Sequence, residues 1–199
     1  IQTCTTQAQL TLSATGGRAP YTYSIDGATV LGTFTSTVTF NVAPGEYSYI
    51  IRDANGCTGF VTNGISVKPI IPLSVDLDVS SAIVRCKGDA TAILIAEAKG
   101  GLGNYMYTLY SGTTGTNVVR PAQNTGQFLD LPVGFYRVSV QSGDCSTVSV
   151  AFEITEPQTP FAVNFDQTNV SCFGESNGKM VITATGGTGA YKYSISPDS

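Results

Sequence analysis

The chain contains no histidine and no tryptophan among its 199 residues. Without histidine, a Ser-His-Asp or Cys-His catalytic arrangement is excluded within this sequence, and so is a metal held by imidazole. No Cys-x-x-Cys pair occurs either, which argues against a zinc site or thioredoxin-like redox chemistry. We therefore expect no enzyme here, with no catalytic residues, no resident metal and no cofactor.

Charged residues are also scarce, at 12% of the chain compared with about 25% in typical soluble domains. The net charge is −4, and phosphate binding needs clustered Lys and Arg, so nucleic acid is not an expected partner. No apolar run approaches the ~20 residues that span a bilayer. Hydrophobic residues make up 42% of the chain, which is enough for packed cores.

What the sequence has instead is a repeat. Two glycines followed by Tyr-x-Tyr occur three times, in segments 14–24 (ATGGRAPYTYS), 98–108 (AKGGLGNYMYT) and 184–194 (ATGGTGAYKYS). A leading cysteine precedes each copy, and these cysteines are spaced by 82 and 86 residues, a length that suits a small sandwich domain. We expect a segment of a longer array, comprising a first repeat over 1–70 that lacks its first strand, a complete repeat over 71–158 and the first part of a third over 159–199.

The second repeat has the pattern of an antiparallel β-sandwich. In its last segment Val148, Val150, Phe152 and Ile154 occupy alternate positions, which predicts one half-buried strand with these four side chains on the same face. No segment of useful length has helical periodicity. The predicted fold class is all-β, with tandem Ig-like antiparallel β-sandwich repeats. The strands expected in the second repeat are 73–79, 91–98, 104–110, 117–120, 126–131, 134–142 and 146–155.

The turn motifs follow from backbone chemistry. Each Gly-Gly pair lies where the second strand turns into the third, and glycine adopts positive φ without a Cβ clash. The two tyrosines of a pair are two residues apart, so both rings should lie on one face of a strand, at the margin of the core. Asn55-Gly56 predicts a tight hairpin between the last two strands of the first repeat.

Five cysteines at repeat-locked positions predict disulfides in an oxidising compartment, although buried thiols are an alternative. Proximity in sequence favours pairing within a repeat, as Cys4–Cys57 and Cys86–Cys145. Alternating strand directions favour a different pairing, because they place the leading and second cysteines at opposite ends of one sandwich. The second cysteine of one repeat would then meet the leading cysteine of the repeat before it, as in Cys4–Cys145. Cys172 is expected to pair beyond residue 199.

The motifs resemble a known family. Segment 172–196 (CFGESNGKMVITATGGTGAYKYSIS) is similar to the start of an SprB repeat, and the stretches PGEYSYIIRDANGC and VGFYRVSVQSGDC are similar to its second half. The resemblance implies a part of a very large adhesin on the surface of a gliding bacterium, exported by the type IX secretion system. The first repeat departs from the pattern with a shorter CTTQAQ, and the second has SGDC where the first has DANGC.

Two further kinds of site are considered. Asp53 and Asn55 resemble the start of a calcium loop, although a hairpin turn explains the same residues. The paired tyrosines could stack on sugar rings, which gives the alternative function of a carbohydrate-binding array that recognises a surface polysaccharide. The expected partners are further repeats of the same polypeptide, and polysaccharide or other adhesin chains are also considered. The candidate stacking tyrosines are Tyr21, Tyr23, Tyr105, Tyr107, Tyr191 and Tyr193.

Overall fold

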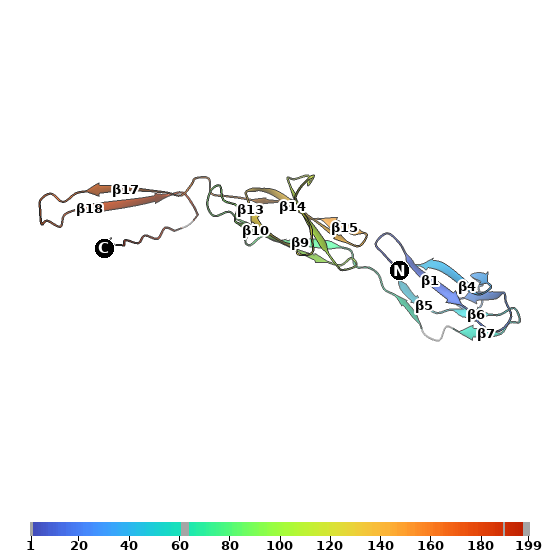
Figure 1. Cartoon of the computed structure of the whole chain (residues 1–199). Helices are drawn as coiled ribbons and strands as arrows, with labels where there is room; N and C mark the ends of the chain where they lie inside the picture. The colour runs from blue at the N-terminus through green and yellow to red at the C-terminus, as the bar shows by residue number, and fades with distance from the viewer. Residues whose placement is uncertain (1, 61–63, 189, 197–199) are drawn as a thin grey trace. The chain divides into compact units, whose positions relative to one another are not determined.

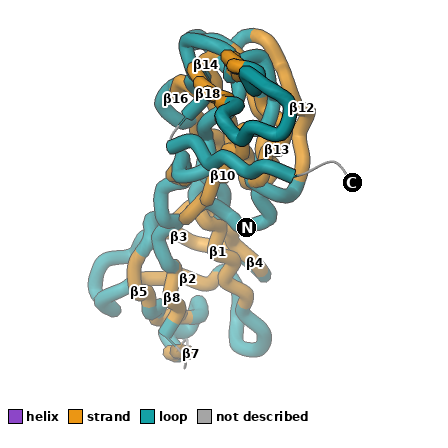
Figure 2. The backbone as a smooth tube through the Cα atoms, turned by 90° about the vertical axis from the view of Figure 1, so that its left-hand side faces the viewer, coloured by secondary structure: helices purple, strands orange, loops and turns teal. Residues whose placement is uncertain are grey.

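The computed structural model describes residues 2–60, 64–188 and 190–196. Within these ranges the chain forms strands, turns and loops and contains no helix, as Figure 2 shows. The all-β prediction is confirmed. Contacts divide the chain into two compact units, which we describe separately. The first comprises Ile1–Ser74 with Lys99–Asn104 and Gln141–Ser146, and the second comprises Val75–Ala98, Tyr105–Val140 and Thr147–Ser199. The repeat boundaries after residues 70 and 158 stay a prediction.

Eight strands of the first unit lie within the first predicted repeat. Figure 1 labels β1, β4, β5, β6 and β7 among them. They form a four-stranded sheet in the order β3-β2-β6-β7 and the two pairs β1-β4 and β5-β8. The pairs β1-β4, β2-β3, β2-β6, β5-β8 and β6-β7 are antiparallel. The strands are β1 (Ala8–Ser13), β2 (Tyr21–Ser24), β3 (Gly32–Phe34), β4 (Thr37–Val42), β5 (Gly45–Tyr47), β6 (Ile50–Arg52), β7 (Thr58–Phe60) and β8 (Ile65–Val67).

Alternation along β1 builds the core of this repeat. Leu10 and Leu12 are buried while Gln9, Thr11 and Ser13 are exposed, as expected for a strand with one face inward. They form a cluster with Val42 and Tyr49. Aromatic side chains, among them Phe40, pack against this cluster and are partly buried.

The strands of residues 74–154 form two antiparallel sheets, each with one buried face. One sheet has the order β13-β10-β9, and the other has the order β12-β11-β14-β15 with β16 paired to β14. Fully buried Leu94 and Phe128 come from the first sheet, and Leu109 and Val138 from the second, which is the core of an Ig-like sandwich. The strands are β9 (Ser74–Asp78), β10 (Ala92–Lys99), β11 (Met106–Ser111), β12 (Asn117–Gln123), β13 (Gln127–Leu131), β14 (Gly134–Ser142), β15 (Cys145–Val148) and β16 (Phe152–Ile154).

Both repeats carry a tyrosine corner, a feature of Ig-like sandwiches in which a tyrosine hydroxyl bonds the backbone just upstream. The hydroxyl of Tyr47 donates to the carbonyl of Ala43 at 2.6 Å. The hydroxyl of Tyr136 donates to the carbonyl of Pro132 at 3.1 Å, with its ring buried. These tyrosines end the Pro-Gly and Val-Gly turns that the sequence repeats.

The last strand of the second repeat differs from its prediction. Instead of one strand over 146–155, β15 and β16 are separated by residues 149–151. Ser149 is buried, and its hydroxyl accepts the backbone N–H of Val138 at 3.0 Å, taking the place of a backbone partner. The buried side chains fall on odd-numbered positions at Cys145 and Ser149, and on an even-numbered position after this interruption, at Ile154. Val148 and Val150 are therefore exposed, and the prediction that they share a buried face with Ile154 is wrong.

Residues 159–196 contribute one antiparallel hairpin, β17 (Ala162–Thr168) with β18 (Lys179–Thr185). The pairing runs from Ala162 opposite Thr185 to Thr168 opposite Lys179. Every residue of β17 is exposed. The Gly-Gly pair of this copy follows directly after β18, as the second pair follows β10, whereas two residues separate β1 from the first pair.

Candidate functional site: the Gly-Gly turns and the cysteine loops

The Gly-Gly and Tyr-x-Tyr motifs form a hydrogen-bonded turn. All six glycines of the three pairs have positive φ, between 64° and 78°, which confirms the expectation from the sequence. In the first and third copies the first tyrosine of the pair closes the turn through its hydroxyl. Tyr21 donates to the carbonyl of Gly16, and Tyr191 donates to the carbonyl of Gly186 at 2.6 Å. The spacing between glycine and tyrosine is thus the span of one turn.

Two Pro-x-x-Pro junctions, at residues 69–72 and 157–160, lie at the boundaries between the predicted repeats. The second Gly-Gly turn holds the first of these junctions, the one that precedes its own repeat. The N–H of Gly101 donates to the carbonyl of Ile71 at 2.8 Å. A Cβ on Gly100 would lie 2.2 Å from the carbonyl oxygen of Pro72, so any larger residue collides with backbone. Glycine is needed here for close approach as well as for its φ.

The third Gly-Gly turn makes the same contact with its own junction. The N–H of Gly187 donates to the carbonyl of Thr159 at 3.2 Å. A Cβ on Gly186 would lie 2.0 Å from the carbonyl oxygen of Pro160. Junction docking onto Gly-Gly is therefore a recurring contact in this chain.

Side chains that precede the second cysteine support the turn from the other side. In the second repeat the fully buried hydroxyl of Ser142 accepts the N–H of Leu102 at 2.8 Å. In the first repeat Asp53 does the same, because its Oδ2 accepts the N–H of Arg18 at 3.0 Å. Leu102 and Arg18 each follow a Gly-Gly pair, so Asp53 and Ser142 occupy equivalent positions.

Asp53 also organises the hairpin that Asn55 and Gly56 predict. Its Oδ1 accepts the N–H of Asn55 at 2.9 Å and that of Cys57 at 2.8 Å. The pKa of Asp53 is lowered, first by the N–H of Arg18 and then by those of Cys57 and Asn55. Gly56 has a φ of 84°, as a tight turn requires. Calcium binding at Asp53 and Asn55 stays a prediction.

The structure joins Cys4 to Cys145 by a disulfide, with the two Cα atoms 5.3 Å apart. The expectation of pairing within a repeat, Cys4 with Cys57 and Cys86 with Cys145, is therefore wrong. The alternative from strand direction is confirmed for this pair. The reason is visible in the second repeat, where Cys86 precedes β10 and Cys145 follows β14. These two cysteines therefore lie at opposite ends of one sandwich and cannot bond to each other.

Asp144 binds the loop that carries the leading cysteine. Its two carboxylate oxygens accept the N–H groups of Cys4 and Thr5, each at 3.0 Å, and the Thr5 hydroxyl also donates to it. Hydrogen bonds from Thr3 and Thr5 side chains, followed by those of the two backbone N–H groups, hold the pKa of Asp144 well below its ordinary value of 3.8. The ionised carboxylate is thus a second link between the same two loops that the disulfide joins.

The lowered pKa of Asp144 predicts an acid-sensitive contribution to stability. A carboxylate whose folded pKa lies below its unfolded value stabilises the fold above about pH 4 and loses that effect as pH falls. The urea midpoint of the wild-type chain should therefore exceed that of Asp144→Asn at pH 7, and the difference should shrink progressively as pH falls below about 4. Asp166→Asn, on the exposed strand β17, is the charge-matched control. A difference that is as large at about pH 3 as at pH 7 would contradict this assignment.

Three cysteines are free and exposed in the structure, namely Cys57, Cys86 and Cys172. Among the described residues, one group of possible metal ligands lies close together, and it consists of Cys4, Asp144 and Cys145. Its two sulfurs are bonded to each other, so it offers no thiolate to a metal and functions as a crosslink.

The candidate stacking tyrosines differ in exposure. Tyr21 and Tyr107 are buried, so most of the surface of these two rings lies in the core. Tyr23 and Tyr105 are half-buried, and Tyr23 stacks on Phe40 with ring centres 5.4 Å apart. Tyr191 and Tyr193 are exposed. Sugar stacking stays a prediction.

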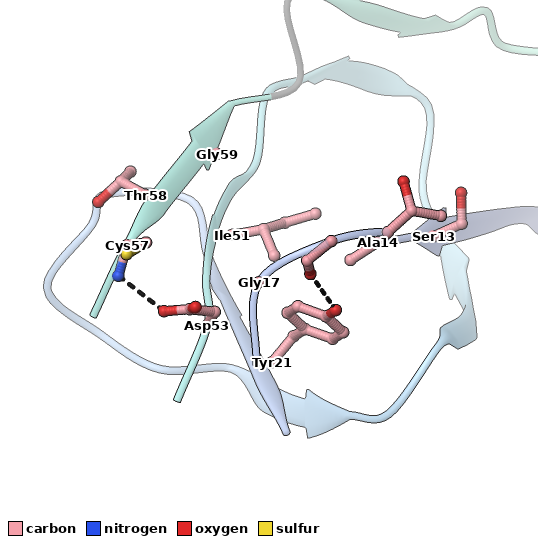
Figure 3. A pocket seen from close by; sticks show the side chains of 11 residues that line it. Ser13, Ala14, Gly17, Tyr21, Ile51, Asp53, Cys57, Thr58 and Gly59 are labelled. Carbon is pink, nitrogen blue, oxygen red and sulfur yellow. Dashed lines mark hydrogen bonds between the residues drawn. The ribbon is translucent and has the colours of Figure 1, made fainter. Parts of the chain in front are cut away.

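A hollow of about 360 Å³ lies beside the first Gly-Gly turn. Gly16, Gly17 and Tyr21 line one part of it, and Asp53 and Cys57 line another. Figure 3 shows Cys57 next to Asp53, joined to it through the hydrogen bond from the Cys57 N–H, with Tyr21 bonded back to its turn. Sequence reasoning selected these residues separately and gave no sign that they surround one hollow.

In the part of the chain that the structure describes, no helix is long and apolar enough to cross a membrane. Solved structures that match this chain include the three N-terminal domains of the bacteriophage RB49 highly immunogenic outer capsid protein. It is 18% identical, with a TM-score of 0.49 over 93% of this chain, and the chain spans 66% of its length. The amphioxus IgVJ-C2 molecule is 14% identical, with a TM-score of 0.36 over 75% of this chain and 97% of that one.

No curated protein matches the chain. The family comparison does, and it falls on the segments that contain the first and third Gly-Gly turns. The model of the SprB repeat matches residues 3–30 and 164–199. These include the leading cysteines Cys4 and Cys172 and the tyrosine pairs of both copies. The chain therefore carries SprB-repeat sequence over residues 3–30 and 164–199.

Proposed function

We propose that this chain is a structural, load-bearing repeat segment of a long bacterial cell-surface adhesin of the gliding-motility type. The observation that carries the proposal is the disulfide between Cys4 and Cys145, which joins the leading cysteine of one predicted repeat to the second cysteine of the next. The SprB-repeat match supports a surface adhesin. The finer assignment, to the gliding-motility type exported by type IX secretion, follows what the resemblance to SprB repeats implies. The segment has no catalytic role in this proposal.

The crosslink has a mechanical consequence. When the chain is pulled from its two ends, tension enters at Cys4, crosses the sulfur–sulfur bond and leaves at Cys145. The residues between them lie outside the load path, so their unfolding does not lengthen the chain. At about 3.5 Å per extended residue, the sequence separation of 141 corresponds to roughly 500 Å of chain that stays protected.

Single-molecule stretching tests this proposal directly. The oxidised chain, held at its termini, should extend only through residues outside the crosslinked loop. With a reductant present, the total extension should increase by about 500 Å, because each freed residue adds about 3.5 Å. Cys57→Ser is the matched control and should behave as the wild type in both conditions. Equal extension with and without reductant would contradict a load-bearing crosslink.

The carbohydrate-binding alternative predicts a different result. A chain that recognises polysaccharide should bind a surface glycan saturably and lose that binding in Tyr193→Ala, whose ring is exposed. A structural segment should show no such binding on an array of bacterial and host glycans. Saturable binding that depends on Tyr193 would replace the structural proposal.

A further inference from the structure

We propose that the hollow beside Cys57 is the docking site for another SprB repeat. In a longer array, that repeat would directly precede the first repeat of this chain. The hollow receives the Pro-x-x-Pro junction of that repeat against Gly16 and Gly17. Cys57 then forms a disulfide with the leading cysteine of the same repeat. This inference rests on the proposed function, because it requires an array longer than this chain.

The second repeat shows such a site when it is occupied. Its turn, Gly100-Gly101, packs against the backbone of Ile71 and Pro72, and Cys145 bonds to Cys4. A junction and a leading cysteine are therefore held by one Gly-Gly turn and one second cysteine. These two contacts define what the occupant must supply.

The first repeat carries the same groups around an open hollow. Gly16 and Gly17 have the φ values of Gly100 and Gly101, within a few degrees. A Cβ on Gly16 would meet nothing within 4 Å, whereas the one on Gly100 would meet the Pro72 carbonyl. Cys57 lines the hollow with a free, exposed sulfur.

The supporting side chain is equivalent as well. A Cβ on Gly17 would lie 2.8 Å from the Asp53 carboxylate, and one on Gly101 would lie 2.9 Å from the Ser142 hydroxyl. Each of these side chains also accepts the N–H of the residue after Gly-Gly. The turn at Cys57 is thus already in the shape that holds a junction in the second repeat.

The third copy supplies independent support. Its Gly-Gly turn holds the backbone of Thr159 and Pro160, as described above. The next residue, Thr188, donates its hydroxyl to the carbonyl of Arg85 at 3.4 Å, and Arg85 directly precedes the leading cysteine Cys86. A Gly-Gly turn therefore lies beside the leading-cysteine loop of the preceding repeat here too.

One element of the occupied site is missing at Cys57. Gly56 stands immediately before Cys57, where Asp144 stands immediately before Cys145. The carboxylate that binds the N–H groups of Cys4 and Thr5 thus has no counterpart in the first repeat. Docking at Cys57 depends on the junction carbonyls and the disulfide.

The covalent step is thiol–disulfide exchange with a disulfide donor such as oxidised glutathione. The Cys57 thiolate attacks the donor and forms a mixed disulfide, releasing one thiol. The leading cysteine of the docked repeat then attacks the Cys57 sulfur and releases the second thiol. Overall, two cysteine thiols of the protein are oxidised to one disulfide, and the donor disulfide is reduced to two thiols. The two protons lost by the cysteines end on the released thiols.

The test adds a preceding repeat to the full chain. Residues 71–171 are placed directly before residues 4–199, so that a copied Cys86 becomes the leading cysteine of the added repeat and segment 157–160 becomes its junction. The product is refolded with oxidised and reduced glutathione and mapped without reduction. We expect a peptide that links Cys57 to the copied Cys86, together with the Cys4–Cys145 peptide that reports correct folding. Alkylation of Cys57 by iodoacetamide should fall at least about tenfold relative to the original chain.

A matched pair of glycine variants separates docking from chance oxidation. Asparagine tolerates positive φ, so it tests the close approach with little backbone strain. In the original chain Gly100→Asn should reduce the yield of Cys4–Cys145, and Gly16→Asn should leave it unchanged. In the extended chain Gly16→Asn should reduce the yield of the new crosslink at Cys57.

The outcomes are decisive in either direction. An extended chain that contains the Cys4–Cys145 peptide but retains a fully alkylated Cys57 would overturn the inference. A Cys57 crosslink that Gly16→Asn leaves unaffected would overturn the docking of the junction. Neither result changes the stretching experiment on Cys4–Cys145, so failure of this inference is distinguishable from failure of the proposed function.

Discussion

Replacing both Cys4 and Cys145 with serine is expected to lower the free energy of unfolding by about 3–5 kcal/mol, because the disulfide closes a loop with a sequence separation of 141. A loop of this size removes a large amount of conformational entropy from the unfolded chain. The structure also loses the covalent link between the Cys4 loop and the turn at Asp144. Urea unfolding followed by tyrosine fluorescence measures the effect, since the chain has ten tyrosines and no tryptophan.

The control for this prediction comes from the other cysteines. Cys57→Ser and Cys86→Ser remove exposed, unpaired thiols and should change the free energy of unfolding by no more than about 0.5 kcal/mol. The wild-type chain in reductant should match the double serine variant. If Cys57→Ser proved as costly as Cys4→Ser, the pairing within the first repeat would be restored and Cys4–Cys145 would be wrong.

Phe128→Ala is expected to cost about 3–5 kcal/mol, which would be the largest effect of a single side chain in the second repeat. Phe128 is 1% exposed on β13, where it faces the core between the two sheets. Its truncation removes a large apolar surface and leaves a cavity that close-packed neighbours fill only in part. Hydrogen exchange across β10 and β14 should then show reduced protection, together with a lower urea midpoint.

Phe173→Ala is the matched control, because the same substitution is made at a fully exposed phenylalanine beside Cys172. Its expected effect is within about 0.5 kcal/mol. Equal losses in the two variants would mean that the core between the sheets is not packed as described. A loss for Phe128→Ala alone establishes that the second repeat is stabilised by its sandwich core as well as by the crosslink.

The packed core and the crosslink between repeats stabilise different parts of the chain. A disulfide within one sandwich would constrain that sandwich alone, whereas the Cys4–Cys145 bond closes a loop that includes parts of two predicted repeats, with a sequence separation of 141. Asp144 adds an electrostatic link at the same place, which weakens in acid as its carboxylate is protonated. Both links act on the loop that carries the leading cysteine.

Strand positions and turn types followed from local chemistry. The alternation of Leu10 and Leu12, the glycine pairs and the Asn55-Gly56 turn lie where the residues predict, because strand periodicity and positive φ depend on a few neighbouring residues. Six of the seven strands expected in the second repeat agree with the structure to within a few residues.

What the sequence alone could not decide were the features that depend on distant segments meeting. Val148 and Val150 have an ideal alternating pattern, yet they are exposed because Ser149 bonds to the neighbouring strand and changes the phase. The partner of Cys145 was ambiguous because several cysteines satisfy sequence spacing and only one lies within bonding distance. The need for glycine at position 100 was predictable in part. Its positive φ is a local property that the sequence indicates, but its close contact with the Pro72 carbonyl depends on packing. Local residues determined the strands and turns, and tertiary packing determined which loops meet, because the free energy of those contacts exists only once both segments are in place.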